Sequence, residues 1–207
     1  MNIAVIAANG RLGKSFVERA LADGHTVHAG IRGRDSLKPH DHLTSVLCDA
    51  TNPSDLKALI KDQDAVVSCI GHVKGSAPNV QTVATKVLVQ VMNELGVKRF
   101  VTVTGTGVRF PGDKIGLVDR FLNYIVTKAD PDRVKDGIDH AKVLRESDLD
   151  WTLIRLLKLQ SANAQPFELK LNGPTKWYVA RDEVAEAMLQ VLTQQTFLRQ
   201  SPIISKK

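Results

Sequence analysis

Short apolar segments alternate with amphipathic segments along most of the chain. The apolar segments are rich in β-branched side chains and nearly continuous, which is typical of strands buried on both faces of a parallel sheet. These predicted strands read NIAVIA, TVHAGI, LTSVLC, DAVVSCI, RFVTVT and WTLIRL.

Helical periodicity fills most of the intervening segments. In the clearest case, positions 79–95, apolar residues recur at three- and four-residue steps and Gly96 follows as a stop. Further helices are expected at about 132–146, after Pro131, and at about 181–192. Strand–helix–strand repeats with right-handed crossovers predict an α/β fold, a single doubly wound Rossmann-type domain with a mostly parallel sheet.

The last third of the chain has a different pattern. The segment FELKLNGPTKWYV predicts a β-hairpin that turns at Asn172 and Gly173. Within one domain spanning 1–207, we expect segments at about 105–135 and 157–180 to form the lid or substrate side. Ligands of such folds bind there, at the carboxyl ends of the strands.

Composition narrows the functional classes. The net charge is +6, but Lys and Arg are scattered beside acidic residues, which favours a solvated basic surface over a nucleic-acid interface. No apolar run approaches a membrane span, and the apolar start lacks a positively charged leader, so we expect a cytoplasmic protein with no membrane partner. Cys48 and Cys69 form no C-x-x-C pair and no cluster with histidines, which predicts reduced thiols and no metal site.

A glycine-containing loop lies between the first predicted strand and an amphipathic helix. It reads Ala7-Ala8-Asn9-Gly10-Arg11-Leu12-Gly13. In such a loop Gly10 allows close approach of a pyrophosphate, and Gly13 allows helix and strand to pack closely. Ala7 replaces the first glycine of the pattern, which is tolerable if its φ angle stays negative. The context predicts a dinucleotide-binding loop, with an ordinary strand-to-helix turn as the alternative.

The ends of the next strands suggest which dinucleotide binds. Arg32 stands where an acidic residue would hold a free ribose 2′-hydroxyl, so it predicts a 2′-phosphate and therefore NADP(H). A solvated loop arginine is the alternative. Arg34 is a possible second contact, although Asp35 beside it could neutralise it. Asp49, just past the third strand, could accept a hydrogen bond from the adenine amino group.

The fourth predicted strand ends in Cys69, Ile70 and Gly71. Small or apolar residues and a glycine at this point would let ribose and pyrophosphate lie against the backbone. For Cys69, a role as a small buried hydrophobe is equally good.

Together these motifs resemble the atypical short-chain dehydrogenases/reductases with NmrA-like NAD(P)-binding domains, and within them the flavin reductase and biliverdin reductase-like branch. The resemblance covers nearly the whole chain. Beside the glycine loop it rests on IR at 31–32, CDAT at 48–51, DAVVSCIG at 64–71, GVKRFVTVT at 96–104, DHAKVLRESDLDWTLIR at 139–155 and ARDEVAEAML at 180–189.

The resemblance implies a set of cofactor contacts, to which Asn9 and Cys69 are added as their neighbours. The implied contacts are Gly10, Arg11, Leu12, Gly13, Arg32, Asp49, Ala50, Ile70, Gly71 and Thr104. The sequence departs from the family pattern at Ala7, at Leu156 and at Gly105, where many members have serine. The last departure leaves Thr104 and Thr106 as substitute hydroxyls.

Two candidates for a proton donor follow. Tyr124 and Lys128 satisfy the Y-x-x-x-K of active short-chain dehydrogenases, but the resemblance does not align them with the catalytic helix; the alternative is a helix with a half-buried tyrosine. His140 corresponds to the family's DH histidine and could donate a proton or shape the acceptor pocket. Alternatively, Asp139 and His140 help to start or cap a helix.

These features favour an NADPH-dependent reductase that transfers hydride to a planar aromatic acceptor such as a quinone or a free flavin. FMN or FAD would then be a substrate rather than a prosthetic group. The alternative is a non-enzymatic, redox-sensing regulator that binds NADP(H). An epimerase or dehydratase would require Tyr124 and Lys128 to be catalytic. The expected partner is a small-molecule acceptor, and the expected state is a monomer or weak homodimer.

Overall fold

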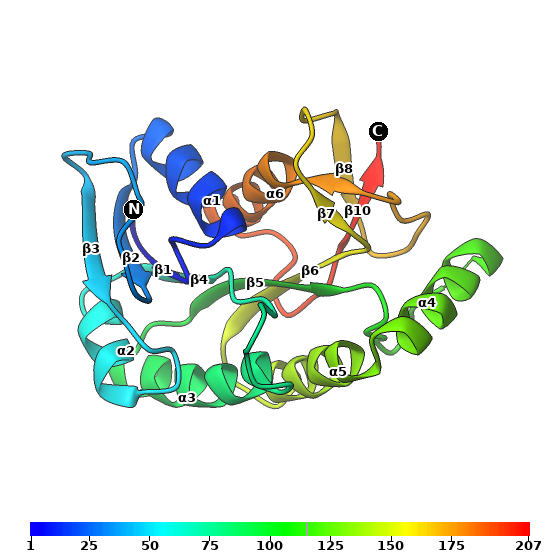
Figure 1. Ribbon diagram of the computed structural model, residues 1–207, viewed down its shortest axis with the longest axis horizontal. Coiled ribbons are helices and arrows are strands. Elements are labelled where there is room, and N and C mark those ends of the chain that lie inside the picture. The colour runs from blue at the N-terminus through cyan, green and yellow to red at the C-terminus, as the bar shows by residue number, and fades with distance from the viewer. Residues whose placement is uncertain (115) are drawn as a thin grey trace.

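A mostly parallel sheet forms the middle layer of the computed structural model, which describes residues 1–114 and 116–207 (Figure 1). Its strand order is β3-β2-β1-β4-β5-β6-β10-β8, and only β8 runs antiparallel to its neighbour. The strands are β1 (Asn2–Ile6), β2 (Thr26–Ile31), β3 (Leu43–Leu47), β4 (Ala65–Ser68), β5 (Arg99–Gly105), β6 (Asp150–Leu156), β8 (Phe167–Lys170) and β10 (Ile203–Lys206). A separate parallel pair consists of β7 (Leu159–Gln160) and β9 (Val179–Ala180).

Helices cover both faces of the sheet. One face carries α1 (Arg11–Ala22) and α6 (Arg181–Thr193), and the other carries α2 (Pro53–Ile60), α3 (Val80–Leu95) and α5 (Pro131–Arg145) (Figure 1). Each layer of helices closes its own hydrophobic core against the sheet. The remaining helix, α4 (Leu117–Ala129), projects beyond the sheet from the start of α5. Among the described residues, no helix is both long and apolar enough to cross a membrane.

Local signals explain several helix ends. The Asn52 side chain accepts the backbone N–H of Ser54 at the start of α2. Asp130 and Pro131 separate α4 from α5, as the sequence predicted, and the Asp130 carboxylate accepts the N–H of Arg133. Gly96 ends α3 with a φ angle of 74°, a left-handed conformation that glycine adopts without strain.

The six predicted strands, the predicted helices and the doubly wound fold are confirmed. The predicted hairpin is wrong. β8 pairs antiparallel with β10, which the sequence analysis missed, whereas β9 pairs with β7. Turn residues at 172–173 therefore do not join neighbouring strands, because the edge strand takes a partner more than thirty residues further along the chain.

The strand order has a switch point between β1 and β4, where successive crossovers leave in opposite directions. Open α/β sheets bind ligands outside the carboxyl ends of the strands at this point. The predicted cofactor residues follow β1, β2, β3 and β4 or, for Thr104, lie at the end of β5, so the fold gathers them at the carboxyl ends of the strands.

Candidate functional site

The glycine loop is packed tightly against the first turn of α1. The Ala8 N–H donates to the Gly30 carbonyl at 3.0 Å, and the Gly10 N–H donates to the Ala7 carbonyl at 3.0 Å. A Cβ atom on Gly13 would lie 2.3 Å from the Ala7 carbonyl oxygen and 2.7 Å from that of Ala8. Only glycine fits at position 13, because the obstructing atoms belong to the backbone. This is the close helix–loop packing expected of a dinucleotide-binding loop.

Ala7 departs from the sequence expectation. Its φ angle is 58°, whereas the sequence analysis required a negative φ angle for alanine to be tolerated at this position. The left-handed region brings Cβ close to the following carbonyl and costs a non-glycine residue roughly 1–2 kcal/mol. The chain therefore keeps the loop shape of the first-glycine position and tolerates strain there.

Replacing Ala7 with glycine is expected to raise the free energy of unfolding by up to about 1 kcal/mol, because the strain relieved exceeds the extra entropy of the unfolded chain. Denaturant unfolding measures the change. Ala8→Gly is the matched control: Ala8 is fully buried, so losing its methyl group should destabilise the protein. Lower stability of Ala7→Gly would contradict the interpretation of Ala7 as strained.

Asn9 connects the glycine loop to the segment that follows β2. Its side-chain amide donates to the backbone carbonyls of Arg32 at 3.0 Å and Arg34 at 3.2 Å. The structure thus places the backbone of both arginines beside the loop, while their side chains remain exposed. Exposed guanidinium groups next to the predicted dinucleotide-binding loop would suit recognition of a 2′-phosphate.

Asp49 lies on the same side of the site. The Thr51 backbone N–H, and then its hydroxyl, lower the pKa of Asp49, and the Arg32 guanidinium adds to this effect. Both Thr51 groups donate to Oδ1 at 2.8 Å. The carboxylate is therefore ionised, and Asn9, Arg32 and Asp49 lie on the same side of the candidate site. The adenine contact of Asp49 and the contact of the half-buried Ala50 stay predictions.

The segment after β4 forms the other half of the site. Cys69 is only 9% exposed, and burial raises the pKa of its thiol to about 12, which fits a small buried hydrophobe. Ile70 is half-buried and Gly71 exposed, with open space where a Gly71 side chain would lie. Thr104 is buried at the end of β5, and its hydroxyl has no hydrogen-bond partner in the described part of the chain.

His140 lies in the protein interior, which argues against the hypothesis that it donates a proton directly to the acceptor. It is 1% exposed, and neither ring nitrogen has a hydrogen-bond partner among residues 1–114 and 116–207. Burial lowers the pKa of His140 to about 4, although Asp136 opposes the shift. It is therefore neutral and presents no accessible surface to an acceptor. The alternative role in starting a helix is wrong, because α5 begins nine residues earlier, at Pro131.

The Y-x-x-x-K pair lies on the projecting helix α4. Tyr124 is 62% exposed, more than the half-buried position expected, and the Lys128 ammonium lies 5.9 Å from its ring centroid. This pair is remote from the strand ends that carry the glycine loop.

A basic cleft with a volume of about 310 Å³ lies between the first turns of α1 and α6. It contains the predicted Arg11 together with Lys14 and Arg181, and Arg181 donates to the Ser161 hydroxyl at 2.7 Å. Asp182 also lines the cleft, so three cationic side chains stand against one acidic side chain. Together with the two helix N-termini, this excess of positive charge makes the cleft favourable for phosphate groups. The sequence indicated Arg11, but Lys14 and Arg181 came together only in the fold.

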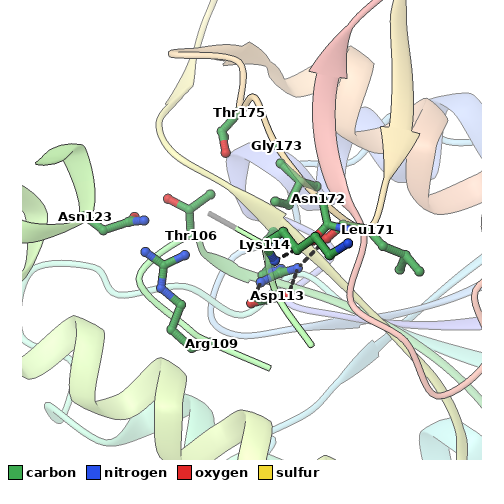
Figure 2. A pocket seen from close by; sticks show the side chains of 11 residues that line it. Thr106, Arg109, Asp113, Lys114, Asn123, Leu171, Asn172, Gly173 and Thr175 are labelled. Atoms are coloured by element: carbon green, nitrogen blue, oxygen red, sulfur yellow. Dashed lines mark hydrogen bonds and ion pairs between the residues drawn. The ribbon is translucent and has the colours of Figure 1, made fainter. Parts of the chain in front are cut away.

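The two segments predicted to form the lid or substrate side meet at a second, much smaller pocket shown in Figure 2. Its free volume is about 10 Å³, enough for about one water molecule. Lys114 donates its backbone N–H to the Asn172 side chain at 2.7 Å. The buried Arg155 guanidinium, at the end of β6, binds both carboxylate oxygens of Asp113 at 2.5 and 3.0 Å. This polar network joins the segment near 106–114 to the segment near 171–175.

The model of the NAD(P)H-binding family matches residues 7–195. The chain belongs to this family. The match spans the glycine loop, all the predicted cofactor residues and α6. The expected resemblance to atypical short-chain dehydrogenases/reductases is confirmed to this extent.

Individual relatives of this NAD(P)H-binding protein are distant. An uncharacterised chloroplast protein of Arabidopsis thaliana is 26% identical, over 92% of this chain and 71% of its own. A short-chain dehydrogenase/reductase of Veillonella parvula in complex with NADP has a TM-score of 0.82 at 18% identity, over 99% of this chain and 94% of that one. The anaerobilin reductase of Escherichia coli O157:H7 has a TM-score of 0.79 at 19% identity, and the match covers 100% of this chain and 97% of the reductase. At such identities these structures confirm the fold of the chain.

Proposed function

We propose that the protein is an NADPH-dependent reductase that passes hydride to a planar aromatic acceptor such as a free flavin or a quinone. The observation that carries this proposal is the loop geometry: Gly13 packs against the Ala7 and Ala8 carbonyls, and Asn9 fixes the loop beside Arg32. This cradle leaves no room for a Cβ atom at position 13, and it suits a bound dinucleotide.

The chain's own residues divide the binding work. Arg32 and Arg34 would hold the 2′-phosphate, and the N-terminus of α1 with Arg11 would hold the pyrophosphate. Ile70, Gly71 and Thr104 border the place where β4 and β5 end, which would receive the nicotinamide half. When bound, NADPH supplies the hydride. Hydride transfer between stacked rings needs mainly positioning, so a buried His140 and a remote Tyr124 do not argue against activity.

The reductase assignment also draws on the similarity to the anaerobilin reductase, which has the same fold. The direct test is NADPH oxidation by the purified chain with FMN, riboflavin, a naphthoquinone and a bilin as acceptors. Acceptor-dependent oxidation would support the proposal. Tight NADPH binding with no turnover on any acceptor would contradict it and would favour a redox-sensing regulator, which the burial of His140 and the position of Tyr124 on the projecting helix α4 also fit.

Cofactor preference should depend on Arg32. We expect NADPH to bind at least about tenfold more tightly than NADH, a difference of about 1.4 kcal/mol. Arg32→Ala should remove this preference by weakening NADPH binding while leaving NADH binding unchanged. Titration followed by nicotinamide fluorescence measures both dissociation constants.

Lys38→Ala is the matched control for Arg32, because Lys38 lies in the same loop but forms an exposed ion pair with Glu18 at 3.0 Å. It should leave the preference intact. Equal affinities for the two cofactors in the unmodified protein, or an unchanged preference after Arg32→Ala, would show that the 2′-phosphate is not read at this position.

A further inference from the structure

A histidine–carboxylate pair lies beside the dinucleotide site and was not singled out from the sequence. Nε2 of His72 lies 3.0 Å from the Asp136 carboxylate and 3.1 Å from the Pro78 carbonyl oxygen. Both neighbours are acceptors, so Nε2 carries the hydrogen. Nδ1 is then the nitrogen that can exchange a proton, and it has no hydrogen-bond partner among the residues described.

Asp136 is rigidly held. Its side chain is fully buried on α5 and accepts the backbone N–H groups of Gln81 and Thr82, each at 2.9 Å, and the Thr82 hydroxyl at 2.5 Å. It therefore caps the N-terminus of α3 from a neighbouring helix. A carboxylate fixed in this way sets the tautomer and orientation of an imidazole that binds it, as in other histidine–carboxylate pairs.

The pair lies where β4 and β5 end. His72 directly follows Gly71, which comes three residues after the last residue of β4. Asp136 precedes Gly137, whose Cβ position would lie 2.8 Å from the Thr104 hydroxyl oxygen at the end of β5. The His72 side chain is 12% exposed, in contrast to the enclosed His140, so a ligand at this edge can reach it.

We propose that His72, oriented by Asp136, is the proton donor to the acceptor, and that the acceptor is a quinone or another conjugated carbonyl compound whose reduction takes up a proton. This inference rests on the proposed reductase function. The acceptor gains a hydride from the bound reduced dinucleotide. Its carbonyl oxygen gains a proton from Nδ1 of the His72 imidazolium as that N–H bond breaks, and Nε2 keeps its own hydrogen. The products are the reduced acceptor and the oxidised dinucleotide, and the neutral imidazole regains its proton from solvent.

Two acceptors separate this role from a structural one. A naphthoquinone requires a proton with the hydride, whereas the N-methylphenazinium cation becomes neutral on gaining hydride alone. His72→Gln keeps an amide that can bind Asp136 but supplies no acid. It should lower kcat/KM for the naphthoquinone at least about tenfold, because general acids contribute factors of this size or more. It should leave kcat/KM for phenazinium and the NADPH dissociation constant within about twofold.

His42→Gln is the matched control, because His42 is exposed just before β3. It therefore lies at the amino ends of the parallel strands, whereas His72 lies at their carboxyl ends. The control variant should change neither acceptor rate. A readout independent of turnover is histidine NMR: with NADP⁺ present, adding the naphthoquinone should shift the imidazole signal that disappears in His72→Gln and leave the His42 signal unchanged.

The outcomes are distinguishable. A naphthoquinone-specific loss together with the imidazole shift would support the proposal. Equal loss with both acceptors, or no loss with either, would overturn it while leaving the reductase function in place. If the unmodified protein reduced phenazinium but not the naphthoquinone, the proposal for His72 would be overturned and the reductase function would stand. A chain that reduces neither acceptor, nor any flavin or bilin, would overturn both proposals.

Discussion

Replacing Gly13 with alanine is expected to destabilise the protein by about 3 kcal/mol, because overpacking against fixed atoms costs this much. The added Cβ would lie 2.3 and 2.7 Å from two carbonyl oxygens. Neither oxygen can rotate away, since Ala7 and Ala8 connect β1 to the loop and Ala8 also binds the Gly30 carbonyl. The midpoint of thermal unfolding should fall by roughly 6–12 °C for a chain of this size. Cofactor binding should be lost as well.

Gly10→Ala is the matched control for this change. A Cβ on Gly10 would meet one atom, the Ala7 carbonyl oxygen at 3.1 Å, and the φ angle of −71° suits any residue. We expect nearly unchanged thermal stability but weaker NADPH binding, because the methyl group would occupy the space that the pyrophosphate approaches. Gly10→Val should abolish binding without unfolding the protein. Equal stability of the Gly13 and Gly10 variants would contradict the account of the loop.

The parts of the fold that the sequence predicted well depend on local periodicity. Nearly continuous apolar runs such as NIAVIA identify buried strands, and the stripe from Val80 to Leu95 identifies a crossover helix. Handedness then orders the strands, since right-handed crossovers permit few arrangements. The candidate cofactor residues were chosen by the same reasoning, because in a parallel sheet each residue just past a strand lies at the same edge, and their contacts with a cofactor stay predictions.

What could not be predicted depends on contacts between distant segments. The partner of β8 is β10, and no turn signal reports a strand pairing across that separation. The left-handed φ angle of Ala7 is likewise not signalled by its residue type, because alanine prefers negative φ angles. His72 directly follows the DAVVSCIG motif, yet its significance depends on Asp136, more than sixty residues away.

The burial of His140 had a weak sequence signal. It lies four residues after Asp136 and four before Leu144, so all three occupy one stripe of α5, and all three are buried. Histidine in such a stripe can be either a core residue or a site residue. Only the packing of α5 against β5, through Gly137 and Thr104, decides that the stripe faces inward.

The second large effect is expected at Asp113, the carboxylate that pairs with Arg155. The two side chains are 11% and 2% exposed, and Arg155 also donates to the carbonyls of Ser201 and Leu171, at 3.0 and 3.1 Å. Asp113→Ala would leave a buried guanidinium with neutral partners only. Breaking such a pair typically costs about 3–5 kcal/mol, so we expect a loss of this size in the free energy of unfolding, measured in denaturant.

Asp139→Ala is the matched control, because Asp139 pairs with Lys135 at 2.5 Å while both side chains stay exposed. Exposed pairs contribute at most about 1 kcal/mol, so this variant should be nearly as stable as the unmodified protein. Similar losses for Asp113→Ala and Asp139→Ala would show that the Arg155 pair behaves as a surface contact.

A double variant tests whether the cost at Asp113 comes from the uncompensated charge. Arg155→Met removes the guanidinium and retains an apolar side chain, so Asp113→Ala combined with Arg155→Met should be more stable than Asp113→Ala alone. Because Arg155 joins the segments near 106–114 and 171–175, hydrogen exchange should accelerate in both segments of the single variant while β1 and β4 keep their protection. Acceleration confined to one segment would mean that the two segments are held independently of each other.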